Sequence, residues 1–199
     1  TSPDAEARRV LIAALDDSDL GVRRSAAEAV SRARITEAAP ALTRWLDDPN
    51  PELRLTATRA LGALRASTSL GALTRMLADA DVEVRKAAVR AVTSVGGAGA
   101  AVALLDRLSD LDASVRVETA RALGELGDRR AVFSLLGALQ DTSVEVRVAS
   151  AASLGRIRDP RAQRGLVTLI HDQAFEARSA AVSALGAIGR DVPDVVADL

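Results

Sequence analysis

Arginine and aspartate, two residues suited to charge-assisted hydrogen bonding, recur along this chain at a fixed spacing. An arginine returns every 31 residues, and an aspartate stands six residues before each one. The arginines are Arg23, Arg54, Arg85, Arg116, Arg147 and Arg178, and the aspartates are Asp17, Asp48, Asp79, Asp110, Asp141 and Asp172. A line of arginines could follow phosphates, but aspartates at the same spacing can accept paired hydrogen bonds from them. We therefore expect this Asp/Arg ladder to be structural and to join each repeating unit to the next.

Residues that could carry catalysis or hold a metal are few. The chain has no cysteine, and His171 is its only histidine. The lack of cysteine excludes thiol catalysis and a zinc–thiolate site. His171 is expected in a loop between repeats, where it assembles no Ser-His-Asp set. The segment 96–99 is glycine-rich like a phosphate-binding loop, but no lysine follows it and no strand is expected before it. We expect a non-enzymatic protein that uses no cofactor and no metal.

Positions that break the repeat are the candidates for binding a partner. Trp45 and Met76, the only tryptophan and the only methionine, occupy the same position in adjacent units, and an arginine precedes each. Tryptophan, methionine and arginine are enriched at protein interfaces. Packing of Trp45 and Met76 against neighbouring helices is the alternative. The predicted partner-binding residues are Arg44, Trp45, Arg75, Met76, Arg107 and Phe133.

Each 31-residue unit has the pattern of two helices. The first helix begins after a capping residue four positions before the arginine: Asp19, Asn50, Asp81, Asp112 or Ser143. Apolar or small residues follow at helical spacing. A glycine recurs eight residues after the arginine, at Gly62, Gly124, Gly155 and Gly186. Because glycine weakens a helix, its recurrence indicates a neighbouring helix packed close to it.

The second helix follows a turn at Gly96, Gly127 or Gly189, with Asp128 and Asp159 placed as caps. Its apolar residues recur every four positions, so they share one side. Residues 3–15 fit this pattern too, and residues 193–199 fit a shortened version. We therefore expect thirteen helices. The first of them lacks a preceding partner, so Leu11, Ile12 and Leu15 are expected to form an exposed, covered or dimeric apolar face.

The phrases Asp-x-x-x-x-Val-Arg, Ala-Leu-Gly and Ala-x-x-x-Leu-x-x-x-Leu resemble HEAT repeats, and most closely the short HEAT-like type named after phycobilisome lyases. The resemblance implies an all-α fold, a right-handed α-α superhelix whose second helices line a concave face. It implies one array over residues 1–199, with a half repeat at 1–15 and about six repeats starting near the ladder aspartates. A related hydroxylase needs paired His-Glu motifs, which this chain lacks.

Charge and hydropathy restrict the class of partner. The formal net charge is −1, which gives no overall attraction to nucleic acid or to acidic membranes. No apolar stretch reaches the length of a membrane helix, and we expect a soluble, cytoplasmic protein.

We expect a non-catalytic scaffold that binds a protein or peptide on the concave second-helix face. The alternatives are a phycobilin-lyase-like subunit that binds a tetrapyrrole, and a structural module of a larger protein. Self-association through the half-repeat ends, and a designed origin, stay open.

Overall fold

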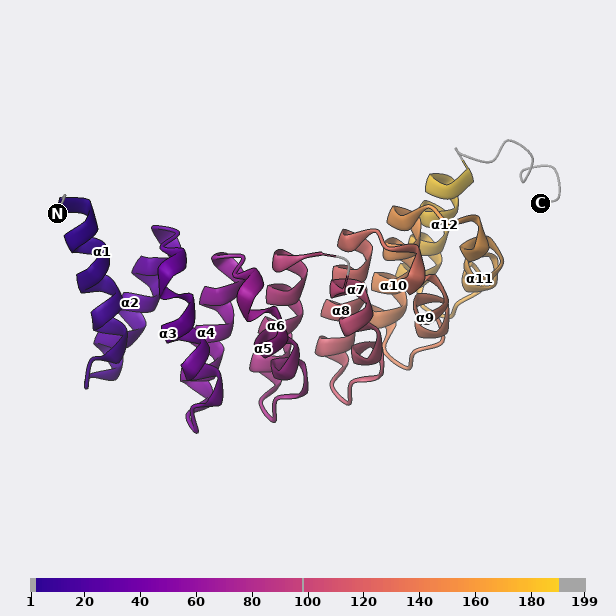
Figure 1. The fold of residues 1–199 in the computed structure, drawn as a ribbon. Coiled ribbons are helices and arrows are strands. Elements are labelled where there is room, and N and C mark those ends of the chain that lie inside the picture. Colours follow the sequence, from indigo (N-terminus) through magenta and orange to yellow (C-terminus); the bar gives the residue numbers. More distant parts are fainter. Residues whose placement is uncertain (1–2, 98, 190–199) are drawn as a thin grey trace. The chain divides into compact units, whose positions relative to one another are not determined.

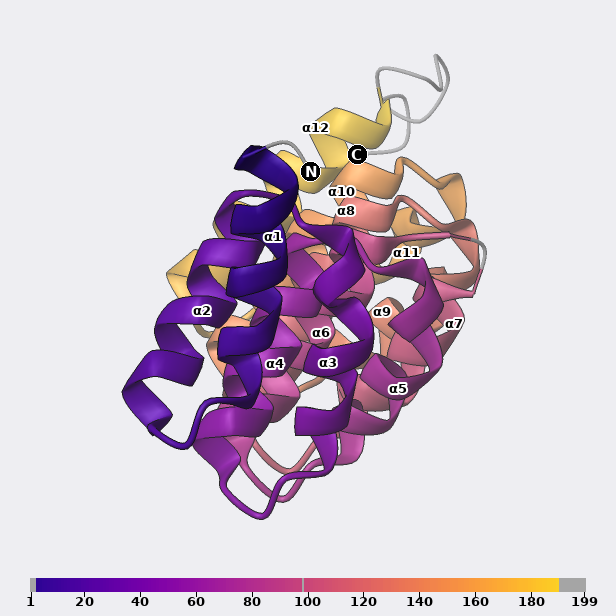
Figure 2. The same cartoon turned by 60° about the vertical axis from the view of Figure 1, so that its left-hand side comes forward.

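A computed structural model describes residues 3–97 and 99–189 of the chain, and these residues form helices and connecting turns without any strand (Figure 1). The chain divides into two compact units, Thr1–Val95 and Gly96–Leu199. Within each unit, first and second helices alternate along the sequence and form two layers (Figures 1 and 2). The prediction of an all-α repeat fold is confirmed. The prediction that all repeats form one continuous array stays a prediction.

The first helices are the longer ones, and neighbours within a unit pack directly against each other. In the first unit they are α2 (Leu20–Arg32), α4 (Pro51–Ala63) and α6 (Val82–Val95). In the second unit they are α8 (Ala113–Leu126), α10 (Val144–Ile157) and α12 (Phe175–Gly189).

The second helices are short α-helices with 3-10 turns next to them, named η here. In the first unit they are α1 (Pro3–Ala13) with η1 (Ala14–Asp16), α3 (Ala39–Arg44) with η2 (Thr36–Ala38) and η3 (Trp45–Asp47), and α5 (Leu70–Arg75) with η4 (Ser67–Ser69) and η5 (Met76–Ala78). In the second unit they are α7 (Ala100–Leu104) with η6 (Leu105–Ser109), α9 (Val132–Ala138) with η7 (Arg129–Ala131), and α11 (Gln163–Leu169) with η8 (Pro160–Ala162).

The predicted caps begin these helices. Asp19 accepts hydrogen bonds from the backbone N–H groups of Gly21 and Val22, and Asp112 accepts one from that of Ser114. Asp128 and Asp159 do the same at the 3-10 turns that precede the second helices. These side chains satisfy N–H groups that have no partner inside the helix, so the local sequence marks where these capped elements start.

The recurring glycine marks a close approach of neighbouring first helices, as predicted. A Cβ added at Gly124 of α8 would lie 2.8 Å from the Cα of Ser153 on α10. Gly62 meets Ala91 and Gly155 meets Ala184 in the same way. Any side chain at these positions would push the two helices apart.

The turn after α8 requires a left-handed backbone, which Gly127 adopts with φ of 65°. Arg158 occupies the equivalent place after α10 with φ of 54°. An arginine pays a conformational penalty there that glycine does not. The turn geometry therefore comes from the packed repeat and not from glycine alone.

Two expectations about the ends of the array have different outcomes. Twelve α-helices lie in the described residues, and the thirteenth was expected at residues 193–199, which lie outside them. In α1 and η1, Leu15 is fully buried, Leu11 and Ile12 are half-buried, and Val10 is exposed. The apolar side of this first segment is thus mostly covered by its own unit. None of the described helices has the length and apolar character needed to cross a membrane.

Candidate functional site

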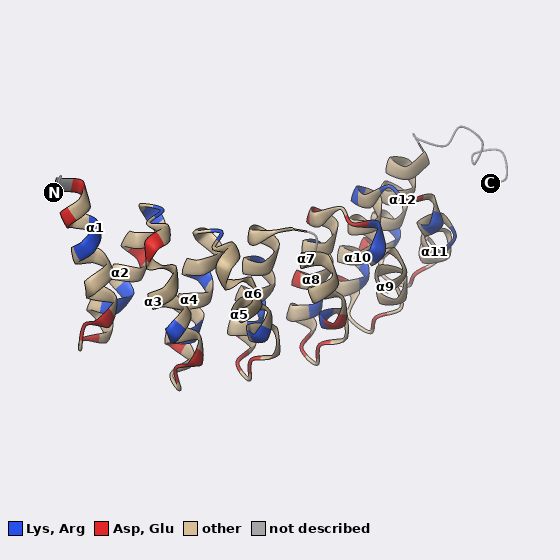
Figure 3. Ribbon diagram, in the orientation of Figure 1, with Lys and Arg blue, Asp and Glu red and all other residues tan. Residues whose placement is uncertain are grey.

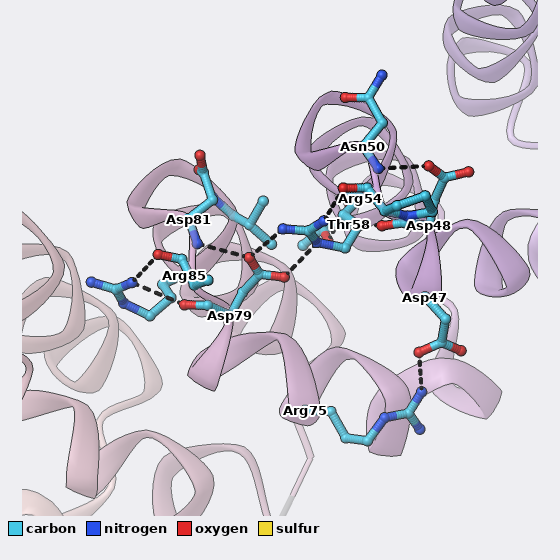
Figure 4. A network of polar contacts seen from close by, with 12 residues as sticks. Asp47, Asp48, Asn50, Arg54, Thr58, Arg75, Asp79, Asp81 and Arg85 are labelled. Carbon is cyan, nitrogen blue, oxygen red and sulfur yellow. Dashed lines mark hydrogen bonds and ion pairs between the residues drawn. The ribbon is translucent and has the colours of Figure 1, made fainter.

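Three of the ladder arginines each bind two successive repeats at once. The Arg116 Nε donates to Asp141 Oδ2 at 2.7 Å and its Nη2 donates to Asp141 Oδ1 at 2.8 Å. Its Nη1 donates to the carbonyl oxygens of Asp110 and Leu111, in the loop that starts its own repeat. The same arrangement joins Arg147 to Asp172 and Arg54 to Asp79, the latter drawn in Figure 4. One guanidinium thus fixes a loop and holds the following repeat.

These pairs are largely shielded from water, and they shift the pKa values of both partners. Hydrogen bonds from Arg147 lower the pKa of Asp172, and the same bonds raise the pKa of Arg147. Burial by itself raises the pKa of Asp141, but hydrogen bonds from Arg116 and from the backbone of Ser143 outweigh it, so the net shift is downward. Each carboxylate stays charged and paired, which leaves these groups little capacity to bind a phosphate.

The first junction of the ladder differs from these three. The Arg23 Nε is buried and has no hydrogen-bond partner among the described residues. Ser31 occupies the position that glycine holds in α4, and a groove of about 520 Å³ separates this part of α2 from α4. The Ser31 hydroxyl donates to the Ala27 carbonyl within α2, and the Arg23 Nε, unlike the Arg54 Nε, does not pair with the next ladder aspartate.

Trp45 and Met76 do not project from the second-helix surface of the first unit. Trp45 is 6% exposed and Met76 is 8% exposed. They occupy the first position of the 3-10 turns η3 and η5, where the chain bends back toward the next first helix. The expectation that these two side chains are accessible anchors is therefore corrected. They pack inside the unit, as the alternative of packing against neighbouring helices predicted.

The two arginines next to Trp45 and Met76 are exposed, and each binds an aspartate in the 3-10 turn of the preceding second helix. Arg44 Nη2 lies 3.0 Å from Asp16 Oδ1, and Arg75 Nη2 lies 3.2 Å from Asp47 Oδ1 (Figure 4). More than half of each of these four side chains is exposed. Exposed ion pairs contribute little stability, about 0 to 1 kcal/mol, so these arginines can exchange partners at little cost.

In the second unit, Phe133 of α9 projects from the second-helix surface and is 67% exposed. The guanidinium carbon of Arg161 lies 5.1 Å from the centre of its ring. Asp159 holds Arg161 in place, because its carboxylate accepts hydrogen bonds from the Arg161 Nε at 2.9 Å and from its Nη2 at 2.7 Å. These hydrogen bonds lower the pKa of Asp159 to about 2. Figure 3 shows further basic residues near α10 and α11.

An open groove of about 830 Å³ adjoins the same surface of α9. Its walls carry both apolar groups and hydrogen-bonding groups: Leu105, Asp106 and Ser109 from η6, and Ser134, Gly137 and Gln140 from α9 and the residues after it. Gly137 lies one helical turn after Phe133, so both occupy one side of α9. No atom lies within 4 Å of where a Gly137 Cβ would be, so the groove exists partly because this position has no side chain.

Among the described residues, Arg107 and His171 do not lie together with others that would form a binding or metal site. Arg107 is mostly covered, and its Nη1 lies 3.9 Å from Asp110 Oδ2. His171 is exposed in the loop before α12, beside Thr168 and Leu169. In the part of the chain that the structure describes, no three potential ligands gather as a metal site would require.

Sequence reasoning missed the groove and the role of Arg161. Gly137 stands where other repeats have Arg44, Arg75, Asp106 and Thr168, so the missing side chain was the available signal. The contact between Arg161 and Phe133 joins two repeats through side chains that are not part of the repeating pattern, so nothing in the sequence pattern indicates it.

Comparison with known proteins places the chain in a family. The HEAT repeats profile matches residues 39–110 and 101–186, while no curated protein matches. The complex of CpcE and CpcF of phycocyanin lyase from Nostoc sp. PCC7120 is 27% identical, with a TM-score of 0.66 over 92% of this chain and 77% of that chain. An engineered protein is 22% identical, with a TM-score of 0.65 over 92% and 97% of the two chains.

A designed armadillo repeat protein in complex with the peptide (KR)4 is 22% identical, with a TM-score of 0.65 over 89% of this chain and 98% of that chain. These likenesses agree with the helical solenoid seen here. Since the family profile covers well over half of the sequence, the chain belongs to the HEAT repeat family.

Proposed function

We propose that this protein is a non-catalytic scaffold that binds an extended protein segment on the second-helix surface of its second unit. The observation that carries the proposal is the position of an exposed aromatic side chain, Phe133, one turn away from the open groove beside Gly137. Extended surfaces built from second helices are a common binding site in repeat proteins.

Phe133 is suited to be the apolar anchor of this surface. Its ring is exposed, yet its orientation is supported by the Arg161 guanidinium, which Asp159 holds in turn. An aromatic side chain fixed before binding loses less conformational entropy when a partner covers it. Phe133 was among the predicted partner-binding residues, and the proposal keeps it.

The groove supplies the polar part of the recognition. Asp106 and Gln140 offer carboxylate and amide groups on opposite walls, and Ser109 and Ser134 offer hydroxyls. An extended peptide exposes backbone N–H and C=O groups that need such partners. The exposed Arg44 and Arg75 of the first unit remain candidates for contacts with acidic groups of a partner, because their present ion pairs are weak.

A partner that is itself a protein is supported by the lyase complex, in which CpcE is found together with CpcF. The same likeness favours a second candidate function, binding of a tetrapyrrole as a lyase subunit. Adding a free bilin and recording its visible absorbance separates the two: a shifted and intensified band that is lost on filling the groove would support the pigment, and an unchanged spectrum would leave the protein segment.

The test uses a library of random peptides displayed on phage, selected against the intact chain. Gly137→Leu adds a side chain at the edge of the groove without its Cβ meeting any neighbour, and Phe133→Ala removes the exposed ring. Gly71→Leu on α5 is the matched control, since its Cβ also has no neighbour within 4 Å and it lies in the other unit.

We expect the selected peptides to bind the unmodified chain and the Gly71→Leu variant equally, and to lose at least about tenfold in affinity with either change on α9. Equal binding to Gly137→Leu would show that the groove is not the site. Far-UV circular dichroism of all variants checks that each one stays folded.

A further inference from the structure

The last described first helix, α12, exposes a face that is buried in every comparable helix of its unit. Val182 of α12 is 61% exposed, whereas Ala120 of α8 and Ala151 of α10, at the same repeat position, are fully buried. Gly186 is also exposed, and among the described residues no atom lies within 4 Å of its Cβ position. In α8 and α10 this face packs against the next first helix, so α12 presents a repeat-binding face.

In the part of the chain that the structure describes, Arg178 on this face makes the ladder contacts to its own loop but not those to an aspartate of a following repeat. Its Nη1 donates to the carbonyl oxygens of Asp172 and Gln173 at 2.8 and 2.9 Å, as the Nη1 of Arg147 does in its own loop. Arg147 uses Nε and Nη2 to grip Asp172. Within residues 3–97 and 99–189, no carboxylate pairs with the guanidinium of Arg178. Its remaining contact there is the ring of Phe175, 5.9 Å away.

The opposite half of this contact is exposed in the first unit, on α2 and the loop before it. Val22 of α2 is 42% exposed, although Leu53 and Val146 at the same repeat position are buried. Ala29 is partly exposed, whereas Ala184, which receives Gly155, is buried. Asp17 is exposed, and in the described part of the chain its carboxylate accepts only the backbone N–H of Asp19. This face has the groups that a preceding repeat would bind.

We propose that the face of α12 in one copy of the chain docks on the face of α2 in a second copy. Asp17 precedes α2 as Asp172 precedes α12, so Arg178 of one copy and Asp17 of the other would form the same paired hydrogen bonds as Arg147 and Asp172. The exposed Gly186 would receive Ala29, as Gly155 receives Ala184. The occupant is a second copy because both halves of a repeat junction are present on this one chain.

The contact joins two different surfaces, so it is heterologous, and association continues at the free ends of each dimer. The segment α1 with η1 strengthens the match. It packs on α2 as a second helix without a first helix ahead of it in the described residues. Docking of α12 would place a first helix there and cover the exposed apolar side chains of both faces.

The experiment measures mass by sedimentation velocity over a concentration series from low micromolar to near millimolar. We expect the mean mass to rise with concentration. Arg178→Asp and Asp17→Arg each place like charges at the junction, and each variant alone should stay monomeric. Mixing the two variants should restore dimers, because Arg178 of the Asp17→Arg chain again meets Asp17 of the Arg178→Asp chain. Recovery on mixing also shows that both variants are folded.

The control is Arg121→Asp, an equal charge change at an exposed position of α8 away from both faces, and it should associate like the unmodified chain. Gly186→Leu is an independent block, since its Cβ has no neighbour in the chain itself but would meet Ala29 of the second copy. A constant monomer mass for the unmodified chain overturns the proposal. Association that survives both Arg178→Asp and Gly186→Leu overturns it as well.

Discussion

Replacing Gly124 by alanine should destabilise the second unit, although the same change normally stabilises a helix. An added Cβ would lie 2.8 Å from Ser153 Cα, while ordinary contact begins near 3.4 Å. The backbones of α8 and α10 must therefore separate by roughly 0.6 Å, the difference between these distances. The Cβ would also displace the Ser153 hydroxyl, which donates a buried hydrogen bond to the Ala120 carbonyl at 2.7 Å.

The magnitude follows from three contributions. Forcing packed elements apart costs about 1–3 kcal/mol, and the lost buried hydrogen bond costs about 1 kcal/mol. Alanine in place of glycine returns about 0.5–1 kcal/mol of helix stability. We expect a net loss of about 1–3 kcal/mol in the free energy of unfolding.

Gly186→Ala provides the matched control, because this glycine has the same repeat position and no neighbour within 4 Å of its Cβ. It should stabilise by about 0.5–1 kcal/mol. The assay is urea unfolding followed by far-UV circular dichroism, at a protein concentration at which the chain is monomeric. If Gly124→Ala proves as stable as Gly186→Ala, the close approach of α8 and α10 does not have the energetic role assigned to it.

Three further changes test other parts of the structure. Arg116→Lys keeps the charge but cannot reproduce the paired bonds to Asp141, so the urea midpoint should fall by the equivalent of about 1–3 kcal/mol; an unchanged midpoint would show that the pair adds nothing. Trp45→Ala removes a buried side chain and should lower the free energy of unfolding by about 3–5 kcal/mol; an unchanged melting temperature would show that Trp45 does not pack in the core. The pKa of Asp159 falls from 3.8 to about 2 beside Arg161, so its contribution to stability is complete only above about pH 5 and is lost as the pH drops to 2 and below. Asp159→Asn should flatten this part of the stability–pH curve by about 1–2 kcal/mol, a value that allows for solvent around the half-exposed arginine.

The repeat fold could be predicted because its signals are local or strictly periodic. The caps at Asp19 and Asp112 depend only on the next two or three residues, and the glycines at Gly62, Gly124 and Gly155 repeat with the period of the packing they permit. Patterns of this kind need no knowledge of the tertiary structure. They determine the helix starts and the spacing between first helices.

The candidate site was harder to predict, because it depends on which way individual side chains turn. Trp45 was expected on the surface, but the residues at the same repeat position include Ala138 and Leu169, which are also buried. That mostly apolar position indicated the core. The groove beside Gly137 depends on a missing side chain, and an absence in one repeat has no periodic signal.

The break at Arg23 shows the same limit. The sequence places an aspartate at Asp48, at the spacing of every other pair, yet the Arg23 Nε has no partner in the described chain. At this junction Ser31 stands at the position that glycine holds in α4, α8 and α10. The regular spacing of the arginine and the aspartate therefore does not by itself ensure that the two side chains pair.

The ladder also has a mechanical consequence. In the second unit, a pulling force along the repeats passes from α8 to α10 through Arg116 and Asp141, and from α10 to α12 through Arg147 and Asp172. The two links are alike and act in series, so tension should release one 31-residue repeat at a time. Each release lengthens the chain by about 100 Å, because an extended chain spans about 3.3–3.6 Å per residue. Such a unit should therefore lengthen in equal steps under load.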